Sequence, residues 1–173
     1  GDYVINSQDD CLNTTTDKTE NANARNTLTI NVNSLTAIVS NDADEGDAID
    51  SNGELYINGG TIIAIAKPGS DAGIDSETGT YINGGTVIAT GDMLDAISSS
   101  SKQNYVILSF QDKPVENTLI TMLDSSDNVV FSYKADRTYS NLIYSSNELK
   151  NGTYTLYKDG EIEGTGTGDP YGP

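Results

Sequence analysis

The chain has 173 residues, and its 26 acidic side chains against 9 basic ones give a formal net charge of −17. Nucleic acid and anionic membrane surfaces would both be repelled by this charge, and the longest apolar run, 62–66, is too short to span a bilayer. The absence of histidine and the presence of a single cysteine exclude histidine-based acid–base catalysis and an intrachain disulfide.

A repeat of about twenty-five residues is the strongest pattern in the chain. Tyr-Ile-Asn-Gly-Gly-Thr occurs at 56–61 and again at 81–86, and Ile-Asp-Ser occurs at 49–51 and again at 74–76. Both pairs of copies are 25 residues apart. Partial copies flank them at 10–13, 28–31 and 95–98.

The apolar residues within each copy alternate along the chain, as Leu55 and Ile57 do. A period of two predicts strands with these side chains facing inward, and the Asn-Gly-Gly and Asp-rich segments predict turns. Stacked copies of this kind predict a right-handed parallel β-helix of about four coils over residues 1–104, because parallel crossovers are almost always right-handed.

The repeat stops after Lys102, and further strands with turn-forming segments between them follow. We expect strands at 105–110, 118–123, 129–133, 142–144 and 154–157. They predict an antiparallel β module, 105–164, that caps the open end of the helix, followed by a linker-like tail, 165–173. The chain is therefore expected to be all-β. The opening residues lack a basic and apolar leader, so we expect a mature fragment of a longer chain.

These motifs resemble a known family. Asp-Ala-Ile-Asp-Ser-Asn-Gly at 47–53, followed by Tyr-Ile-Asn-Gly-Gly-Thr at 56–61, resembles the extracellular carbohydrate-binding β-helix proteins of cellulolytic and gut anaerobic bacteria. That family is related in shape to polysaccharide lyases and was long catalogued as a domain of unknown function. Residues 106–110, 124–131, 143–146 and 149–157 are similar to its closing β module. The resemblance implies a right-handed parallel β-helix, calcium bound by the repeated acidic turns, and affinity for plant cell-wall polysaccharide.

The acidic turns predict a metal site, because residues one repeat apart stack about 4.8 Å from one another. Asp50 is expected over Asp75, and unscreened carboxylates at that spacing repel unless a hard divalent cation lies between them. The predicted calcium ligands are Asp10, Asn13, Asp47, Asp50, Asp71, Asp75, Asp92 and Asp95. The alternative is that these side chains are solvated turn formers that bond their own backbone amides.

Tyr56, Tyr81 and Tyr105 follow one another at nearly the repeat spacing. Since their neighbours face inward, we expect the three rings to point outward in line on one flat face. Such a row suits stacking on pyranose rings, and these three residues are the predicted carbohydrate-binding set. An aromatic stack that stabilises the sheet is the alternative.

These features favour a non-catalytic, calcium-binding module for plant cell-wall polysaccharide, cellulose or pectin. Two alternatives stay open: a calcium-dependent, pectate-type lyase, with Lys67 as the proton-abstracting base, and a structural adhesin or spacer. The expected partner is a polysaccharide, with no nucleic acid and no membrane insertion. We expect a bacterial protein outside the cell or at its surface, either a monomer or part of a longer chain.

Overall fold

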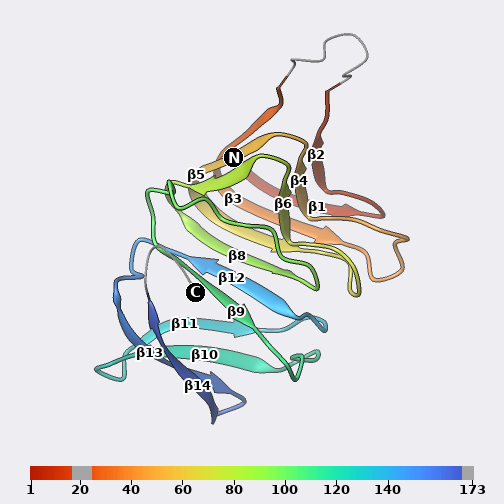
Figure 1. Cartoon of the computed structure of the whole chain (residues 1–173). Coiled ribbons are helices and arrows are strands. Elements are labelled where there is room, and N and C mark those ends of the chain that lie inside the picture. Colours follow the sequence, from red (N-terminus) through yellow and green to blue (C-terminus); the bar gives the residue numbers. More distant parts are fainter. Residues whose placement is uncertain (17–24, 169–173) are drawn as a thin grey trace.

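The computed structural model describes residues 1–16 and 25–168, and every regular element in these ranges is a β-strand (Figure 1). This confirms the prediction of an all-β chain. The described residues include no helix long and apolar enough to cross a membrane.

The strands form three sheets. The seven-stranded sheet contains β1 (Asp2–Ser7), β3 (Thr27–Val39), β5 (Glu54–Ile65), β7 (Gly79–Ile82), β8 (Thr86–Gly91), β9 (Tyr105–Ser109) and β12 (Asn141–Ser145). The three-stranded sheet contains β2 (Leu12–Thr14), β4 (Ile49–Ser51) and β6 (Ile74–Ser76). The four-stranded sheet contains β10 (Leu119–Asp124), β11 (Val129–Lys134), β13 (Gly152–Lys158) and β14 (Glu161–Gly168).

Parallel pairing stacks successive copies of the repeat on one another. β1, β3, β5 and β8 pair in this order in the seven-stranded sheet, and β2, β4 and β6 do so in the three-stranded sheet. Tyr56 lies opposite Tyr81, and Asp50 lies opposite Asp75. The register that the repeat predicts is confirmed at these positions.

The first hydrophobic core lies between the seven-stranded and three-stranded sheets. Leu55, Ile57 and Ile62 of β5 face Ile49 and Ile74 of the three-stranded sheet, and all are almost completely buried. Burying each of these side chains stabilises the fold by about 1.5–3 kcal/mol. The alternation of apolar and polar residues along β5 therefore directs every second side chain into the core between the two sheets.

Residues after 104 are divided between two sheets. β12 pairs antiparallel with both β8 and β9, so it extends the seven-stranded sheet beyond its last parallel strand. The four-stranded sheet packs against the outer face of the seven-stranded sheet and encloses the second core, which includes Ile120, Met122 and Phe131. Figure 1 shows β10, β11, β13 and β14 gathered beneath β12 and β9.

The tail that was expected to be a linker starts inside β14. This strand continues to Gly168 and pairs antiparallel with β13 along its whole length. The remaining tail residues, 169–173, lie outside the described residues.

The last partial copy of the repeat, 95–98, is shifted from its expected place. By the period of the repeat, Ser98 would follow Asp50 and Asp75 in their column, but Ile97 bridges Thr80, and the Ser98 amide donates to the Thr80 carbonyl at 2.8 Å. Only residues 92–96 separate β8 from Ile97, too few to add a fourth strand to the three-stranded sheet and still reach Thr80. The expectation for Ser98 is therefore wrong.

Candidate functional site

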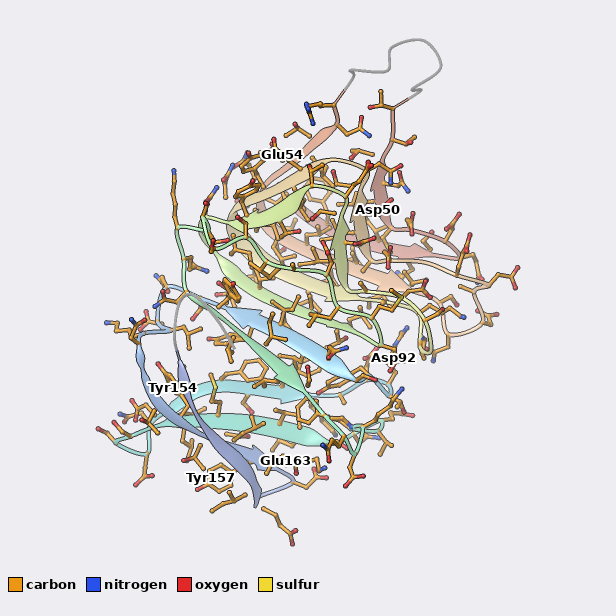
Figure 2. The ribbon with its side chains drawn as sticks, viewed as in Figure 1. Asp50, Glu54, Asp92, Tyr154, Tyr157 and Glu163 are labelled. Carbon is orange, nitrogen blue, oxygen red and sulfur yellow. The ribbon has the colours of Figure 1, made fainter. Side chains whose placement is uncertain are left out.

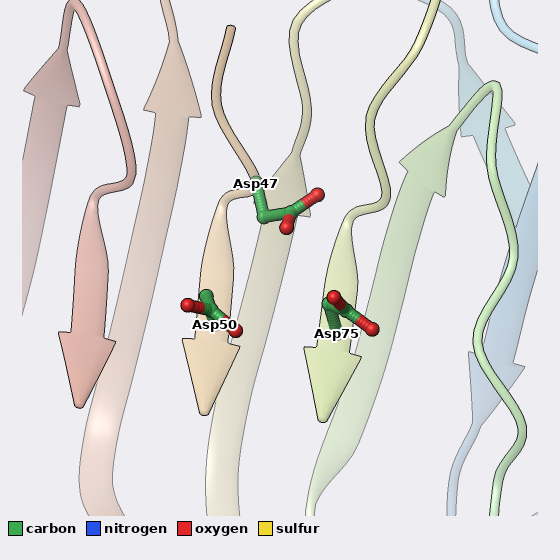
Figure 3. A group of neighbouring side chains, drawn as sticks. All are labelled: Asp47, Asp50 and Asp75. Carbon is green, nitrogen blue, oxygen red and sulfur yellow. The ribbon is translucent and has the colours of Figure 1, made fainter. Parts of the chain in front are cut away.

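Three carboxylates gather along the short strands β4 and β6. An oxygen atom from each of Asp47, Asp50 and Asp75 lies within 4.8 Å of the other two (Figure 3). Asp50 and Asp75 are register partners on the two strands, and Asp47 precedes β4. We call these residues the aspartate triad. All three belong to the ligand set that the repeat predicts.

Backbone and amide donors hold the aspartate triad in place. Asp47 accepts from the Ala72 amide at 2.7 Å, so it braces the turn before β6, and Asp75 accepts from the Ser76 amide at 2.9 Å. Asp50 accepts from the side-chain amides of Asn13 at 2.8 Å and Asn52 at 3.1 Å. None of the ion pairs among the described residues involves these three aspartates. Their negative charge is therefore not balanced by a basic side chain in that part of the chain.

Burial and repulsion from neighbouring carboxylates make the charged form of the aspartate triad unfavourable. Burial, followed by the neighbouring carboxylates, raises the pKa of Asp47 to about 7 and that of Asp50 to about 6. The pKa of Asp75 is raised by burial and then by the nearby charges of Asp95 and Asp10. Asp50 is only 8% exposed. A divalent cation would relieve this repulsion, because opposite charge nearby favours the ionised carboxylate.

The donor atoms of the aspartate triad fit a hard cation. Carboxylate oxygens are the ligands that calcium and magnesium prefer, whereas zinc and copper sites use nitrogen or sulfur. Three carboxylates supply between three and six oxygens, depending on how many bind through both. Calcium accepts six to eight oxygens in a flexible geometry, so the triad together with water is sufficient for it.

Asp10 and Asn13 lie next to the triad, and each contacts the other as well as a triad residue. Asp10 accepts from the Asn13 side-chain amide at 2.5 Å and from the backbone amide of Asp47 at 2.8 Å. Asn13 is exposed, since β2 is the edge strand of its sheet. The structure therefore places these two predicted ligands one strand away from the gap between β4 and β6.

Asp71 is not one of the three clustered carboxylates. It accepts from the Ser70 hydroxyl at 2.7 Å, and it is Ala72, the next residue, that donates its backbone amide to Asp47. Asp71 instead lines a shallow acidic depression beside the triad. The residues around this depression are Asp9, Asp10, Glu45, Gly46, Asp47 and Asp71.

Asp92 bonds to the C-terminal part of the chain and is not part of the triad. Its carboxylate lies 2.6 Å from the Lys113 ammonium, and it also accepts from the Ser140 hydroxyl and the Gly69 amide. Burial alone would raise the pKa of Asp92, but these hydrogen bonds lower it overall. Figure 2 shows Asp92 well away from Asp50, near the start of β12.

Asp95 is held by the strand that carries Asp75. It accepts from both the backbone amide and the hydroxyl of Ser76, each at 3.0 Å. The repeat predicts a second acidic column that Asp10 heads and that Asp47 and Asp95 continue, but the chain reaches the Thr80 level by Ile97. Asp95 therefore lies beside the last rung of the three-stranded sheet and forms no rung of its own.

Tyr56 and Tyr81 form a stacked pair on the outside of the repeat region. Their ring centroids are 4.7 Å apart, and their planes differ by 11°. The predicted alignment holds for these two residues. However, each ring covers one face of the other, and Thr29 of β3 is the register partner of Tyr56 on its other side, so the half-buried pair presents mostly ring edges.

Tyr105 does not extend this stack, which corrects the expected row of three. Its strand, β9, pairs antiparallel with β12 and not with β7. Tyr105 packs against the first core, its hydroxyl donates to the Ile97 carbonyl at 3.1 Å, and burial raises its pKa. The spacing of 24 residues from Tyr81 therefore does not reflect another stacked copy.

Lys67 was the proposed base of a lyase. Its backbone amide donates to the Gly46 carbonyl at 3.2 Å. No hydrogen bond or ion pair found in the described residues joins its ammonium group to the aspartate triad.

The sequence reasoning missed Asn52, whose side-chain amide donates to Asp50. Its place directly after Ile-Asp-Ser in the repeat was the available signal.

Comparison with known proteins supports the repeat. A family model described as a β-helix repeat matches residues 55–76 and 81–101. The matched segments include Asp75, Tyr56 and Tyr81. Neither the curated proteins nor the solved structures that were searched gave a match. The chain is thus an all-β protein that carries β-helix repeats.

Proposed function

We propose that residues 1–104 form a right-handed parallel β-helix of about four coils and that residues 105–164 form its antiparallel β cap. The parallel stacking of β1, β3, β5 and β8 supports the helix. The antiparallel β12 and β9, which follow β8 in the sheet, support the cap, since they cover the edge that the last coil would leave unpaired.

We further propose that the protein is a non-catalytic, calcium-binding module that attaches to polysaccharide. The aspartate triad is the observation that carries this proposal: three carboxylates share one small volume, and two of them have pKa values raised to about 7 and about 6. Carboxylate oxygens suit both calcium and magnesium; calcium is the fitting ion because it accepts six to eight oxygens in a flexible geometry, whereas magnesium requires a near-ideal octahedron. Because calcium would bind only the folded state, it would stabilise the stacking of adjacent coils.

The stacked tyrosines support the polysaccharide part of the proposal. Tyr56 and Tyr81 are stacked and only half-buried, so their ring edges could contact a sugar chain. The resemblance to carbohydrate-binding β-helix proteins points to plant cell-wall glycans, met outside the bacterial cell or at its surface. A net charge of −17 favours a neutral glucan such as cellulose for direct binding, whereas pectin carries carboxylates and needs calcium as a bridge.

A pull-down with cellulose and with polygalacturonate, in calcium and in chelator, tests this proposal. We expect cellulose binding to survive chelation as long as the protein is folded, and polygalacturonate binding to disappear. The double variant Tyr56→Ala/Tyr81→Ala should bind less cellulose per folded molecule, whereas Tyr3→Ala, at a tyrosine 52% exposed on β1, should not. Failure to bind either glycan under any condition would remove the polysaccharide role.

A further inference from the structure

The three-stranded sheet has two places where side chains of neighbouring strands lie side by side, and we call each of them a gap. The two gaps are not equivalent. Between β4 and β6, Asp50 lies opposite Asp75, so carboxylates line the gap from both strands. Between β2 and β4, Asp50 lies opposite Asn13, so one side of that gap carries an amide. The repeat therefore places the same acidic position in two coils and a neutral residue in the third.

Asn13 makes the contacts that a cation would make in its gap. Its Nδ2 atom donates to Asp10 at 2.5 Å and to Asp50 at 2.8 Å. A side-chain amide has two such hydrogens, and both are used here. Two carboxylates from neighbouring coils are thus held together by a neutral donor, and the place between them is taken.

No further gap of this kind follows β6 in the described part of the chain. The amide and hydroxyl of Ser76 both point to Asp95, and the next segment pairs at Thr80 through Ile97. No fourth rung therefore lies across from Asp75 within the three-stranded sheet.

We infer that the chain holds one calcium ion, in the gap between β4 and β6, and that Asn13 confines it there. This rests on the proposed calcium binding and adds its stoichiometry and a residue that determines it. Aspartate at position 13 would make the gap between β2 and β4 resemble the one between β4 and β6. Asn13→Asp should then create a second site from Asp10, Asp50 and the new carboxylate.

Calorimetric titration of the chelator-treated full chain with calcium alone tests this inference. Salt at about 0.15 M screens weak binding to the acidic surface. We expect one equivalent for the unchanged chain and two for Asn13→Asp. The matched control is Asn147→Asp, which adds the same charge at an exposed position and should leave one equivalent.

The outcomes separate this inference from the proposed function. If the unchanged chain binds no calcium, the proposed calcium role is wrong. If it binds one ion and Asn13→Asp also binds one, the role stands and the inference is overturned; two or more equivalents for the unchanged chain overturn it as well. Should Asn13→Asp fail to fold, Asp10→Asn decides: we expect one equivalent, and none would place the ion beside β2.

Discussion

The repeat region and the residues after 104 form their strand pairs in different ways. In the repeat region the partner of a residue is one copy away, as Tyr56 and Tyr81 are. In the C-terminal region, Leu142 of β12 pairs with Thr90 on one side and with Leu108 on the other. A repeat fixes register through its own period, so side chains of one kind form columns. Antiparallel strands from distant segments have no such period, and their register depends on packing.

The two regions are nevertheless joined through shared strands and contacts. Ile143 of β12 packs in the first core, while its neighbours Leu142 and Tyr144 pack in the second, because successive strand residues face opposite sides. The Arg137 guanidinium also donates to the carbonyls of Val39 at 2.6 Å and Ala66 at 3.3 Å. We therefore expect one cooperative unfolding transition.

Truncating a core residue in either region should have the largest effect. Ile57 of the first core and Ile120 of the second are both 0% exposed, so each change to alanine should destabilise the protein by about 2–5 kcal/mol. Denaturant unfolding followed by fluorescence and by circular dichroism should show the same single transition moved by both variants. Val129→Ala, at a residue 64% exposed, is the control. Two transitions, each moved by only one variant, would mean that the regions fold independently.

Removing the Arg137 contacts should have the next largest effect. Arg137→Met keeps much of the apolar stem but leaves the Val39 and Ala66 carbonyls without this donor, so we expect a loss of about 1.5–3 kcal/mol. Lys134→Met, at an exposed residue, should change stability little. The free energy of unfolding from urea titration measures both, and equal values for the two variants would contradict the account.

Stability should depend on pH in a way that reports the aspartate triad. The pKa values of Asp47, about 7, and Asp50, about 6, lie above the value of about 3.9 for an unfolded aspartate. The folded chain therefore holds protons that the unfolded chain has released, and its stability should fall as pH rises from about 5 to about 7.5 in chelator. No histidine titrates in this window. Melting temperatures across the window measure the trend, which Asp47→Asn should weaken and saturating calcium should abolish. A flat profile in chelator would be inconsistent with the buried carboxylates.

The smallest effect concerns Tyr105. Tyr105→Phe removes the hydroxyl that donates to the Ile97 carbonyl, and we expect a loss of about 0.5–1.5 kcal/mol. Tyr3→Phe, at an exposed tyrosine, should be neutral. The melting temperatures of the two variants test whether the Tyr105 hydroxyl has a structural role. Equal melting temperatures would contradict that role.

The sequence predicted those parts of the site that depend on the repeat alone. The pairing of Asp50 with Asp75 and of Tyr56 with Tyr81 follows from an offset of 25 residues. Asp92 could not be placed in this way, because its position depends on Lys113 and Ser140, which reach it only through the packing of the C-terminal region.

Smaller departures from the period also escaped the sequence reasoning. The short connection 92–96 moved the last copy out of register, and nothing in the apolar alternation of that copy signals the change. Asn13 was predicted as a metal ligand because it occupies the column of Asp50. Its two hydrogen bonds to carboxylates became evident only once the distances between neighbouring strands were known.

The melting temperature in calcium compared with that in chelator tests the central claim most directly. At a hundredfold excess of calcium over its dissociation constant, binding should stabilise the folded chain by about 2.7 kcal/mol, which corresponds to a rise of about 5–11 °C for a chain of this size. Asp50→Asn and Asp75→Asn should lose most of this rise, because each removes a carboxylate of the triad. An unchanged melting temperature on chelation of the unaltered protein would contradict the account.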